Sequence, residues 1–177
     1  ISSKRWIYEQ YDTTVQTNTL EGPGSDAAVL QLPTDGHALA VSTDGNGRFT
    51  YLNPRTGGRV AVVEAARNVA CSGARPIAVT NCLNFGNPLR PEVYHQLSEA
   101  VAGMGEACRT LNTPVTGGNV SLYNETGGEP VYPTPVIGMV GLLTNLEKRI
   151  PSYFQHAGDE IWVVGVTREE IGATEYL

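Results

Sequence analysis

Short apolar runs bounded by glycine, proline and asparagine recur along the chain and predict strands separated by helices and turns. Strands of four to eight residues, rich in β-branched side chains, have this pattern. We expect strands in five segments: through Val29 and Leu32, from His37 to Thr43, from Pro76 to Thr80, from Tyr132 to Leu143, and from Asp159 to Val166.

Two longer segments have apolar residues three and four positions apart, the spacing of amphipathic helices. The first runs from Gly58 to about Ser72, with its apolar face formed by Val62, Ala65, Ala66, Val69 and Ala70. The second runs from Pro91 to Leu111, with a stripe formed by Tyr94, Leu97, Val101, Met104, Cys108 and Leu111. A short helix through Trp6 and Ile7 is also expected.

Two glycines, Gly103 and Gly105, interrupt the second long helix. Glycine weakens a helix by roughly 1 kcal/mol relative to alanine. We therefore expect these two residues to allow another backbone to approach closely. Cys108, on the apolar stripe, is expected to be a core thiol.

The stretch from Thr116 to Glu125 is the most suggestive of chemistry. Its adjacent glycines, Gly117 and Gly118, let backbone amides approach a ligand. Asparagine, serine and glutamate follow and supply oxygen atoms, which suits a phosphate held together with Mg²⁺. A tight turn between a helix and a hairpin explains the same residues, since short glycine motifs often have no ligand.

Polar residues at strand ends and on the first long helix provide further candidates. Asp26 lies on a glycine-rich turn, where a carboxylate binds a metal or caps its own loop. Asp44 follows a buried strand, at the edge where open sheets bind ligands. Glu64 and Asn68 cluster with Arg67 on the helix, as a ligand site or a solvated face. Asn81 ends a strand and has an amide suited to a nucleotide.

Composition narrows the function classes. The 177 residues are 41% hydrophobic and 17% charged, with a net charge of −6. No basic stripe marks a nucleic-acid surface. The three cysteines are odd in number and lack CxxC spacing, which favours neither disulfides nor zinc and makes the reduced cytoplasm the expected compartment. No apolar run of about 18 residues predicts a membrane span.

The motifs of several common enzyme classes are missing from the sequence. The histidines, His37, His95 and His156, are scattered, and no nucleophile elbow, P-loop lysine motif or dinucleotide fingerprint occurs. Any triphosphate would therefore be neutralised by metal ions and amide dipoles.

The motifs taken together resemble phosphoribosylformylglycinamidine synthase, in the second of its two related halves. The matching segments are Tyr11 to Asn18, Gly24 to Val29, Arg67 to Pro76, Leu83 to Pro88, Gly117 to Glu125 and Tyr132 to Gly141. They cover nearly the whole chain, and the last two are highly specific.

This resemblance implies an ATP-dependent ligase of purine biosynthesis. Such an enzyme converts formylglycinamide ribonucleotide to the amidine with ammonia from glutamine, ATP activating the amide oxygen and Mg²⁺ balancing the phosphate charge. Implied partners are the first half of the same polypeptide, a glutaminase subunit and a small bridging subunit.

Carried over by motif, Asn81 and Gly118 are expected to contact ATP, Asn119 to bind Mg²⁺ and Ser121 to contact the ribonucleotide. Metal-proximal roles are expected for Asp44, Glu64 and Asn68. Two departures matter. An amide, Asn81, replaces the common aspartate, and the family's catalytic histidine has no counterpart after Asp44. We therefore expect the chain alone to be inactive.

The implied fold is α+β, of the type of the AIR-synthetase N-terminal domain. We expect a four-stranded, mostly antiparallel sheet with helices on one face, pairing into a barrel-like dimer. Residues 1–150 would form this ATP-binding domain and 151–177 the start of a truncated second domain, since the chain begins without Met and ends inside an element.

Two alternatives stay open. The chain is a structural pairing module whose nucleotide site is vestigial or permanently filled, forming a homodimer through the same sheet. Alternatively, it belongs to aminoimidazole ribonucleotide synthetase, selenophosphate synthetase or thiamine-monophosphate kinase, which the segment from Gly117 to Glu125 disfavours.

Overall fold

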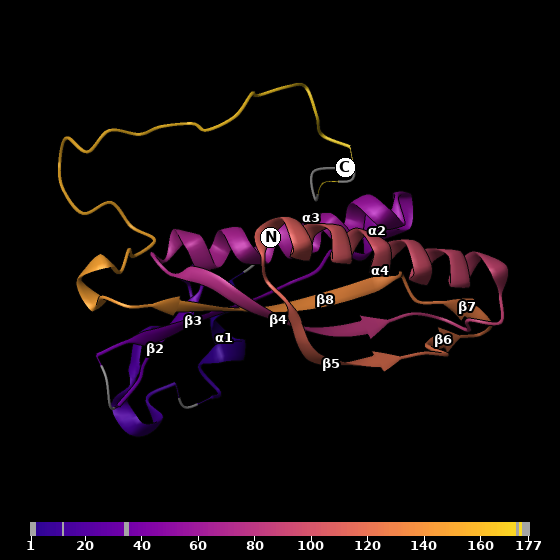
Figure 1. Cartoon of the computed structure of the whole chain (residues 1–177), viewed down its shortest axis with the longest axis horizontal. Helices are drawn as coiled ribbons and strands as arrows, with labels where there is room; N and C mark the ends of the chain where they lie inside the picture. Colours follow the sequence, from indigo (N-terminus) through magenta and orange to yellow (C-terminus); the bar gives the residue numbers. More distant parts are fainter. Residues whose placement is uncertain (1–2, 12, 34–35, 173, 175–177) are drawn as a thin grey trace.

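A six-stranded mixed sheet forms the centre of the chain (Figure 1). The computed structural model describes residues 3–11, 13–33, 36–172 and 174. In spatial order the strands are β1 (Thr19–Glu21), β2 (Ala28–Gln31), β3 (Ala38–Asp44), β8 (Thr134–Leu143), β4 (Arg75–Asn84) and β5 (Val115–Ser121). Neighbouring strands are antiparallel, except that β4 and β5 are parallel.

The prediction of four mostly antiparallel strands is therefore wrong in the number of strands. The two edge strands, β1 and β5, were not predicted. Strand β5 lies in the stretch expected to be either a phosphate-binding segment or a tight turn. Its two adjacent glycines are typical of turns and gave no indication of a strand. Strand β5 runs parallel to β4 because a long helix lies between them in the chain and returns it to the same end of the sheet.

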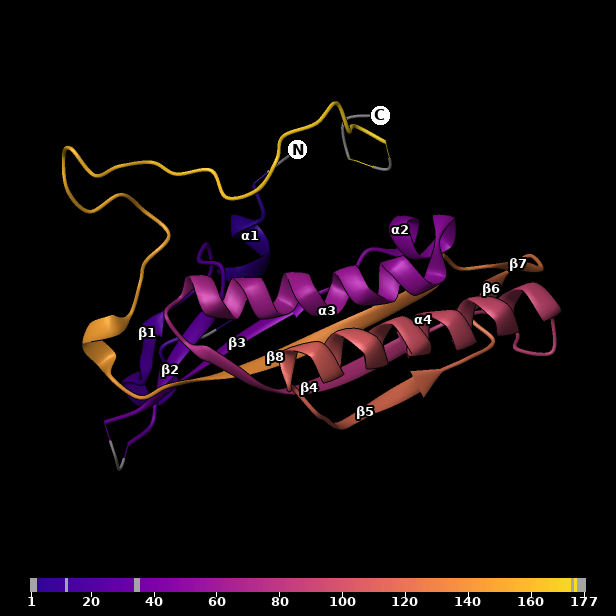
Figure 2. The ribbon, with the colours of Figure 1, turned by 45° about the horizontal axis from the view of Figure 1, so that its top comes forward.

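Two long helices, α3 (Pro54–Cys71) and α4 (Pro91–Leu111), lie side by side on one face of the sheet (Figure 2). The bounds of α4 are those predicted. Helix α3 begins earlier than expected, because the side chain of Asn53 accepts a hydrogen bond from the Thr56 amide and Pro54 occupies the first turn.

Short elements complete the fold. They are α1 (Arg5–Tyr8), the 3₁₀ turn η1 (Val15–Thr17), α2 (Gly47–Leu52), the hairpin strands β6 (Glu125–Thr126) and β7 (Glu129–Pro130), and the 3₁₀ turn η2 (Leu146–Lys148). Within the described ranges, no helix is both long and apolar enough to cross a membrane.

Each central strand places alternate side chains on opposite faces of the sheet. Ala40, Met139 and Ile137 are fully buried beneath the helices. Side chains on the opposite face are only partly buried, although they are apolar. This second apolar surface, called the open face, is formed by Leu39, Val41, Val136, Val140 and Leu142.

The apolar stripe predicted for α4 is partly wrong. Met104 and Cys108 are buried, but Tyr94 is 62% and Val101 45% exposed. The helix packs against α3 through small residues, so part of the predicted apolar stripe faces solvent. A Cβ on Gly103 would lie only 1.9 Å from the Arg55 carbonyl oxygen of α3. Hydrophobicity alone does not identify glycine as a contact residue. The buried face is formed by Val93, Ala100, Gly103, Met104, Ala107 and Cys108.

The expected core thiol is confirmed, because Cys108 is buried among the core residues, and this burial raises the pKa of its thiol. The expected close backbone approach is confirmed at Gly103. Gly105 has no such role, because its nearest neighbour is the flexible end of the Arg109 side chain.

The strand predicted from Asp159 to Val166 is not formed. This segment is irregular, and Trp162 is 80% and Val164 98% exposed (Figure 1). An isolated strand leaves its backbone groups without partners, and among the described residues no strand pairs with this segment. The β-prone sequence is therefore insufficient without a neighbouring strand.

The glycines of α4 give a direct test of helix packing. We expect Gly103→Ala to lower the free energy of unfolding by about 1–3 kcal/mol, because α3 must shift to admit a methyl group. Gly105→Ala is the matched control and should raise it by up to about 1 kcal/mol, through helix propensity alone. Urea denaturation followed by circular dichroism measures both. Equal effects of the two substitutions would contradict the close contact.

Candidate nucleotide site

The parallel pairing of β4 with β5 brings together four of the residues predicted to contact ligands. Asn81 lies opposite Gly118, Cys82 opposite Asn119, and Asn84 opposite Ser121. Two features differ from the predictions. Asn81 lies inside β4 and not at its end, and Gly118, Asn119 and Ser121 belong to a strand and not to a loop. These four residues therefore lie on adjacent strands.

Gly118 is held against Asn81 at close range. Its φ is +152°, and a Cβ at this position would lie 2.3 Å from the backbone oxygen and 2.4 Å from Oδ1 of Asn81. A larger residue would force the two strands apart. The side-chain amide of Asn81 therefore lies against the main chain of Gly118, and only glycine fits at position 118.

Strand β5 is an edge strand and its residues are exposed from Val115 to Val120. A Cβ added to Gly117 would meet nothing within 4 Å. Main-chain amides along such an edge are able to bind an anion, because no side chain blocks the approach. This edge is the feature expected of a site that contacts phosphate.

Asn124 and Glu125, which end the glycine-rich stretch, bind other parts of the protein instead of pointing outwards. Asn124 Nδ2 donates to the carbonyl oxygens of Phe85, at 3.1 Å, and Ser121, at 2.9 Å. Glu125 Oε1 accepts from the Asn87 amide at 3.0 Å. Sequence reasoning treated both as ligand donors. These hydrogen bonds join the end of the glycine-rich stretch to Phe85 and Asn87, which follow β4.

The other predicted metal residues lie around the end of β3. Asn68 Nδ2 donates to both carboxylate oxygens of Asp44, at 3.1 and 3.2 Å. Glu64 lies one turn earlier on α3, where it lines a shallow surface cavity with Arg59 and Arg67. Glu64 and Asn68 are both partly buried and lie one turn apart on the same side of α3, whereas Arg67, the third member of the predicted cluster, is exposed.

The predicted metal ligands occupy two places. Strands β8 and β4 separate Asp44 on β3 from Asn119 on β5. Three strand spacings amount to about 14 Å, too far for one ion. Within the described part of the chain, no three His, Cys, Asp or Glu side chains are grouped to hold a metal. Neutral oxygens on β4 and β5 therefore suit a Mg²⁺ ion whose remaining ligands are water and phosphate.

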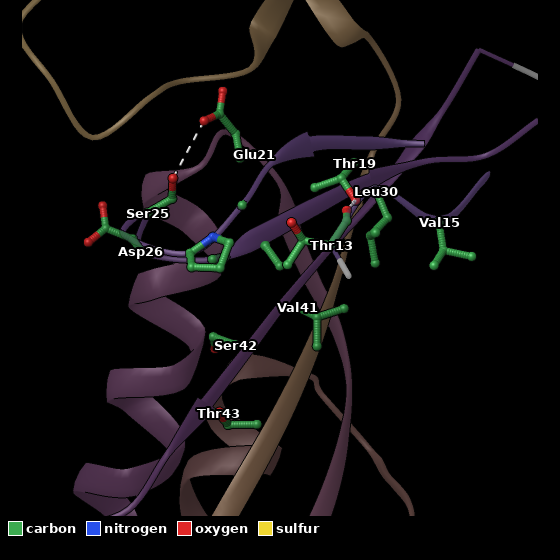
Figure 3. A pocket seen from close by; sticks show the side chains of 14 residues that line it. Thr13, Val15, Thr19, Glu21, Ser25, Asp26, Leu30, Val41, Ser42 and Thr43 are labelled. Atoms are coloured by element: carbon green, nitrogen blue, oxygen red, sulfur yellow. Dashed lines mark hydrogen bonds between the residues drawn. The ribbon is translucent and has the colours of Figure 1, made fainter. Parts of the chain in front are cut away.

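A separate cavity of about 520 Å³ lies beside β1, β2 and β3 (Figure 3). Figure 3 shows Glu21, Ser25 and Asp26 of the glycine-rich turn on one side of it and Val15 and Leu30 on the other. Glu21 also forms an ion pair with Arg149 at 2.9 Å. Strand β8 separates this cavity from β4 and β5, so the four motif residues do not line it.

Comparisons with known proteins identify the family. Residues 24–143 match the model of "AIR synthase related protein, N-terminal domain". The phosphoribosylformylglycinamidine synthase subunit PurL of Moorella thermoacetica is 56% identical over 177 residues, covering all of this chain and 24% of the relative. The PurL subunit of Chlorobium chlorochromatii is 57% identical over 182 residues, again covering all of this chain and 24% of the relative.

Solved structures agree with this match. Thermotoga maritima PurL complexed with ATP superimposes with a TM-score of 0.71 at 35% identity, over 80% of this chain and 23% of that one. The structure of PurLQS from Thermotoga maritima superimposes with a TM-score of 0.75 at 37% identity, over 80% of this chain and 24% of that one.

The chain thus spans about a quarter of the length of these relatives. The resemblance derived from the motifs is confirmed, and so is the expected domain type, apart from its strand number. The match to the family model covers β2, β3, β4, β5 and β8 together with both long helices. The chain belongs to the AIR synthase related protein family, through its N-terminal domain.

Proposed function

We propose that this chain is part of an ATP-dependent carbon–nitrogen ligase that converts formylglycinamide ribonucleotide, with ammonia from glutamine, into formylglycinamidine ribonucleotide in purine biosynthesis. The observation that carries the proposal is the placement of Asn81, Gly118, Asn119 and Ser121 on two adjacent strands. The relatives at 56% and 57% identity are subunits of this synthase. Structures of T. maritima PurL have been solved in complex with ATP and with formylglycinamide ribonucleotide (FGAR).

Each residue has a role that its chemistry allows. The Asn81 side-chain amide and the Gly118 main chain contact the nucleotide, because they place hydrogen-bond donors beside each other on adjacent strands. Asn119 would supply one oxygen to a Mg²⁺ ion bound with the nucleotide, and Ser121 contacts the ribonucleotide. Bound Mg²⁺ would neutralise the phosphates, which no P-loop lysine does here.

Asp44, Glu64 and Asn68 belong to a second metal-proximal group at the end of β3. The hydrogen bonds from Asn68 hold the Asp44 carboxylate in one orientation. A carboxylate fixed in this way suits a hard cation bound with several waters. This group serves another ion than the one at Asn119, since two strands lie between them.

We assign residues 1–150 to the ATP-binding domain and 151–177 to a second domain, with residues 1–2, 12, 34–35, 173 and 175–177 outside the described residues. The open face pairs with the first half of the same polypeptide in a barrel-like arrangement, or with a second copy of the chain when alone. The structure of PurLQS supports a glutaminase and a bridging subunit as partners. We assign the enzyme to the cytoplasm, where purine precursors are made.

The role of Asn119 distinguishes this enzyme from a structural pairing module. In the full-length enzyme, Asn119→Ala should lower kcat about tenfold or more and leave the melting temperature unchanged. Disturbed metal coordination typically has an effect of this size on activity. Excess MgCl₂ should restore part of the activity. The control is Asn145→Ala, which removes a cap from η2 in the turn after β8 and should leave turnover unchanged. Unchanged turnover with a lowered melting temperature for Asn119→Ala would instead support the pairing module.

Gly118 and Gly117 form a matched pair for testing the nucleotide contact. Gly118→Ala places a methyl group against Asn81, so the Kd for ATP should rise roughly tenfold or more, the loss of about one charge-assisted hydrogen bond. Gly117→Ala enters open space and should change the Kd less than about twofold. Isothermal titration with Mg·ATP measures both. Equal affinities for the two variants would exclude β5 from the nucleotide site.

The open face predicts the oligomeric state of the chain alone. We expect a homodimer in sedimentation velocity experiments. Val140→Glu should convert it to a monomer, because an unpaired buried charge costs several kcal/mol. Val63→Glu, on the outer surface of α3, is the control and should leave the dimer intact. A monomeric parent chain at micromolar concentration would contradict pairing through this face.

A further inference from the structure

The hydroxyl group of Ser121 has a dedicated partner that no motif identified. Asn124 Nδ2 lies 3.1 Å and Asn124 Oδ1 3.2 Å from Ser121 Oγ. Both side chains are partly buried. One amide therefore offers a donor and an acceptor to the same hydroxyl, and it limits the directions in which that hydroxyl can point.

Asn124 is itself fixed to the core. Its side chain donates to the carbonyl oxygen of Phe85 at 3.1 Å, and its own main-chain amide donates to the same oxygen at 3.2 Å. Phe85 is fully buried at the end of β4. The position of the Asn124 amide is thus set by the packing of β4 and not by solvent.

The turn between Ser121 and Asn124 is shaped to bring the two side chains together. Tyr123 has a φ of +61°, a left-handed conformation that is uncommon for residues other than glycine. Its side chain is 59% exposed, so burial of the ring does not impose this backbone. Such conformations are concentrated at functional sites, where the surrounding contacts stabilise them.

We infer that Asn124 is a positioning residue, which holds the Ser121 hydroxyl so that its hydrogen faces an acceptor group of the ribonucleotide, such as its phosphate. This inference rests on the proposed function, in which Ser121 contacts that substrate. Asn124 Nδ2 shares its two hydrogens among the carbonyl oxygens of Phe85 and Ser121 and the Ser121 hydroxyl oxygen, at 3.1 Å. In the absence of ligand, the hydroxyl hydrogen points to Asn124 Oδ1 at 3.2 Å, a neutral acceptor that a charged phosphate oxygen of the ligand can replace. An aspartate at this position has no N–H to donate to Oγ, and its charged carboxylate would bind the hydroxyl hydrogen more strongly than the neutral Oδ1 does and would repel an anionic substrate.

Four variants of the full-length enzyme test the inference: Ser121→Ala, Asn124→Ala, Asn124→Asp and the double variant Ser121→Ala with Asn124→Ala. Each of the two alanine variants should raise the KM for formylglycinamide ribonucleotide about fivefold to tenfold, the loss of one hydrogen bond, with the KM for ATP unchanged. Asn124→Asp should raise it further. The double variant should resemble Ser121→Ala alone, because Asn124 acts through the serine.

A loop variant separates positioning from general stability. Asn87→Ala removes the cap on the Leu89 amide in the loop that follows β4, without touching Ser121. It should lower the melting temperature while leaving both KM values unchanged. If Asn124→Ala does the same, Asn124 is only a structural tether and the inference is wrong.

The remaining outcomes distinguish this inference from the proposed function. Additive effects in the double variant would also overturn the inference, because they mean that Asn124 acts without the serine. An unchanged KM in Ser121→Ala would overturn the substrate contact itself, and the positioning role with it. A raised KM in Ser121→Ala with an unchanged KM in Asn124→Ala would leave the proposed function in place and remove only the role of Asn124.

Discussion

The parallel pairing of β4 with β5 is the constraint on which the candidate site depends. The two strands meet at Gly118 and Asn81, where the absence of a side chain allows the backbones to approach. Helix α4 makes this possible, since it returns the chain to the same end of the sheet. The close contact between α4 and α3 at Gly103 fixes that helix in turn. Two glycines distant in sequence thus control one polar edge.

The chemistry of this edge follows from its neutral oxygens. Asn81, Asn119 and Ser121 contribute no charge, so they cannot form a complete cation site without a phosphate ligand. In the proposed function, these neutral ligands favour a metal that arrives with its nucleotide over one bound permanently by the protein. Carboxylates occur elsewhere, at Asp44 beside α3 and at Glu21 and Asp26 beside the cavity near β1. These three carboxylates therefore lie away from the amide-rich strands, whereas Glu125, close to Ser121 in the sequence, accepts a hydrogen bond from the Asn87 amide.

The two faces of the sheet are covered to different extents. Beneath α3 and α4 the side chains are fully buried, and the helices satisfy their packing within the chain. On the open face, apolar residues such as Val41 and Val140 remain partly exposed opposite each other. Apolar surface of this kind is typical of an interface. The proposed pairing with a second sheet would cover this apolar surface.

The sequence by itself determined the two long helices, the central strands β3 and β8, the core position of Cys108 and the family, because regular apolar spacing and extended motifs are local properties. It did not determine the exposed side of α4 at Tyr94, the strand character of β5 or the absence of a strand after Asp159. Those features depend on which backbone packs beside each segment, and glycine contacts and strand partners are properties of the tertiary structure. The candidate residues were found from motifs. Only the fold showed that Asn119 and Asp44 lie apart, because strand order sets the separation across a sheet. Only the fold showed that Asn124 reaches Ser121, because turn geometry sets the direction of a side chain.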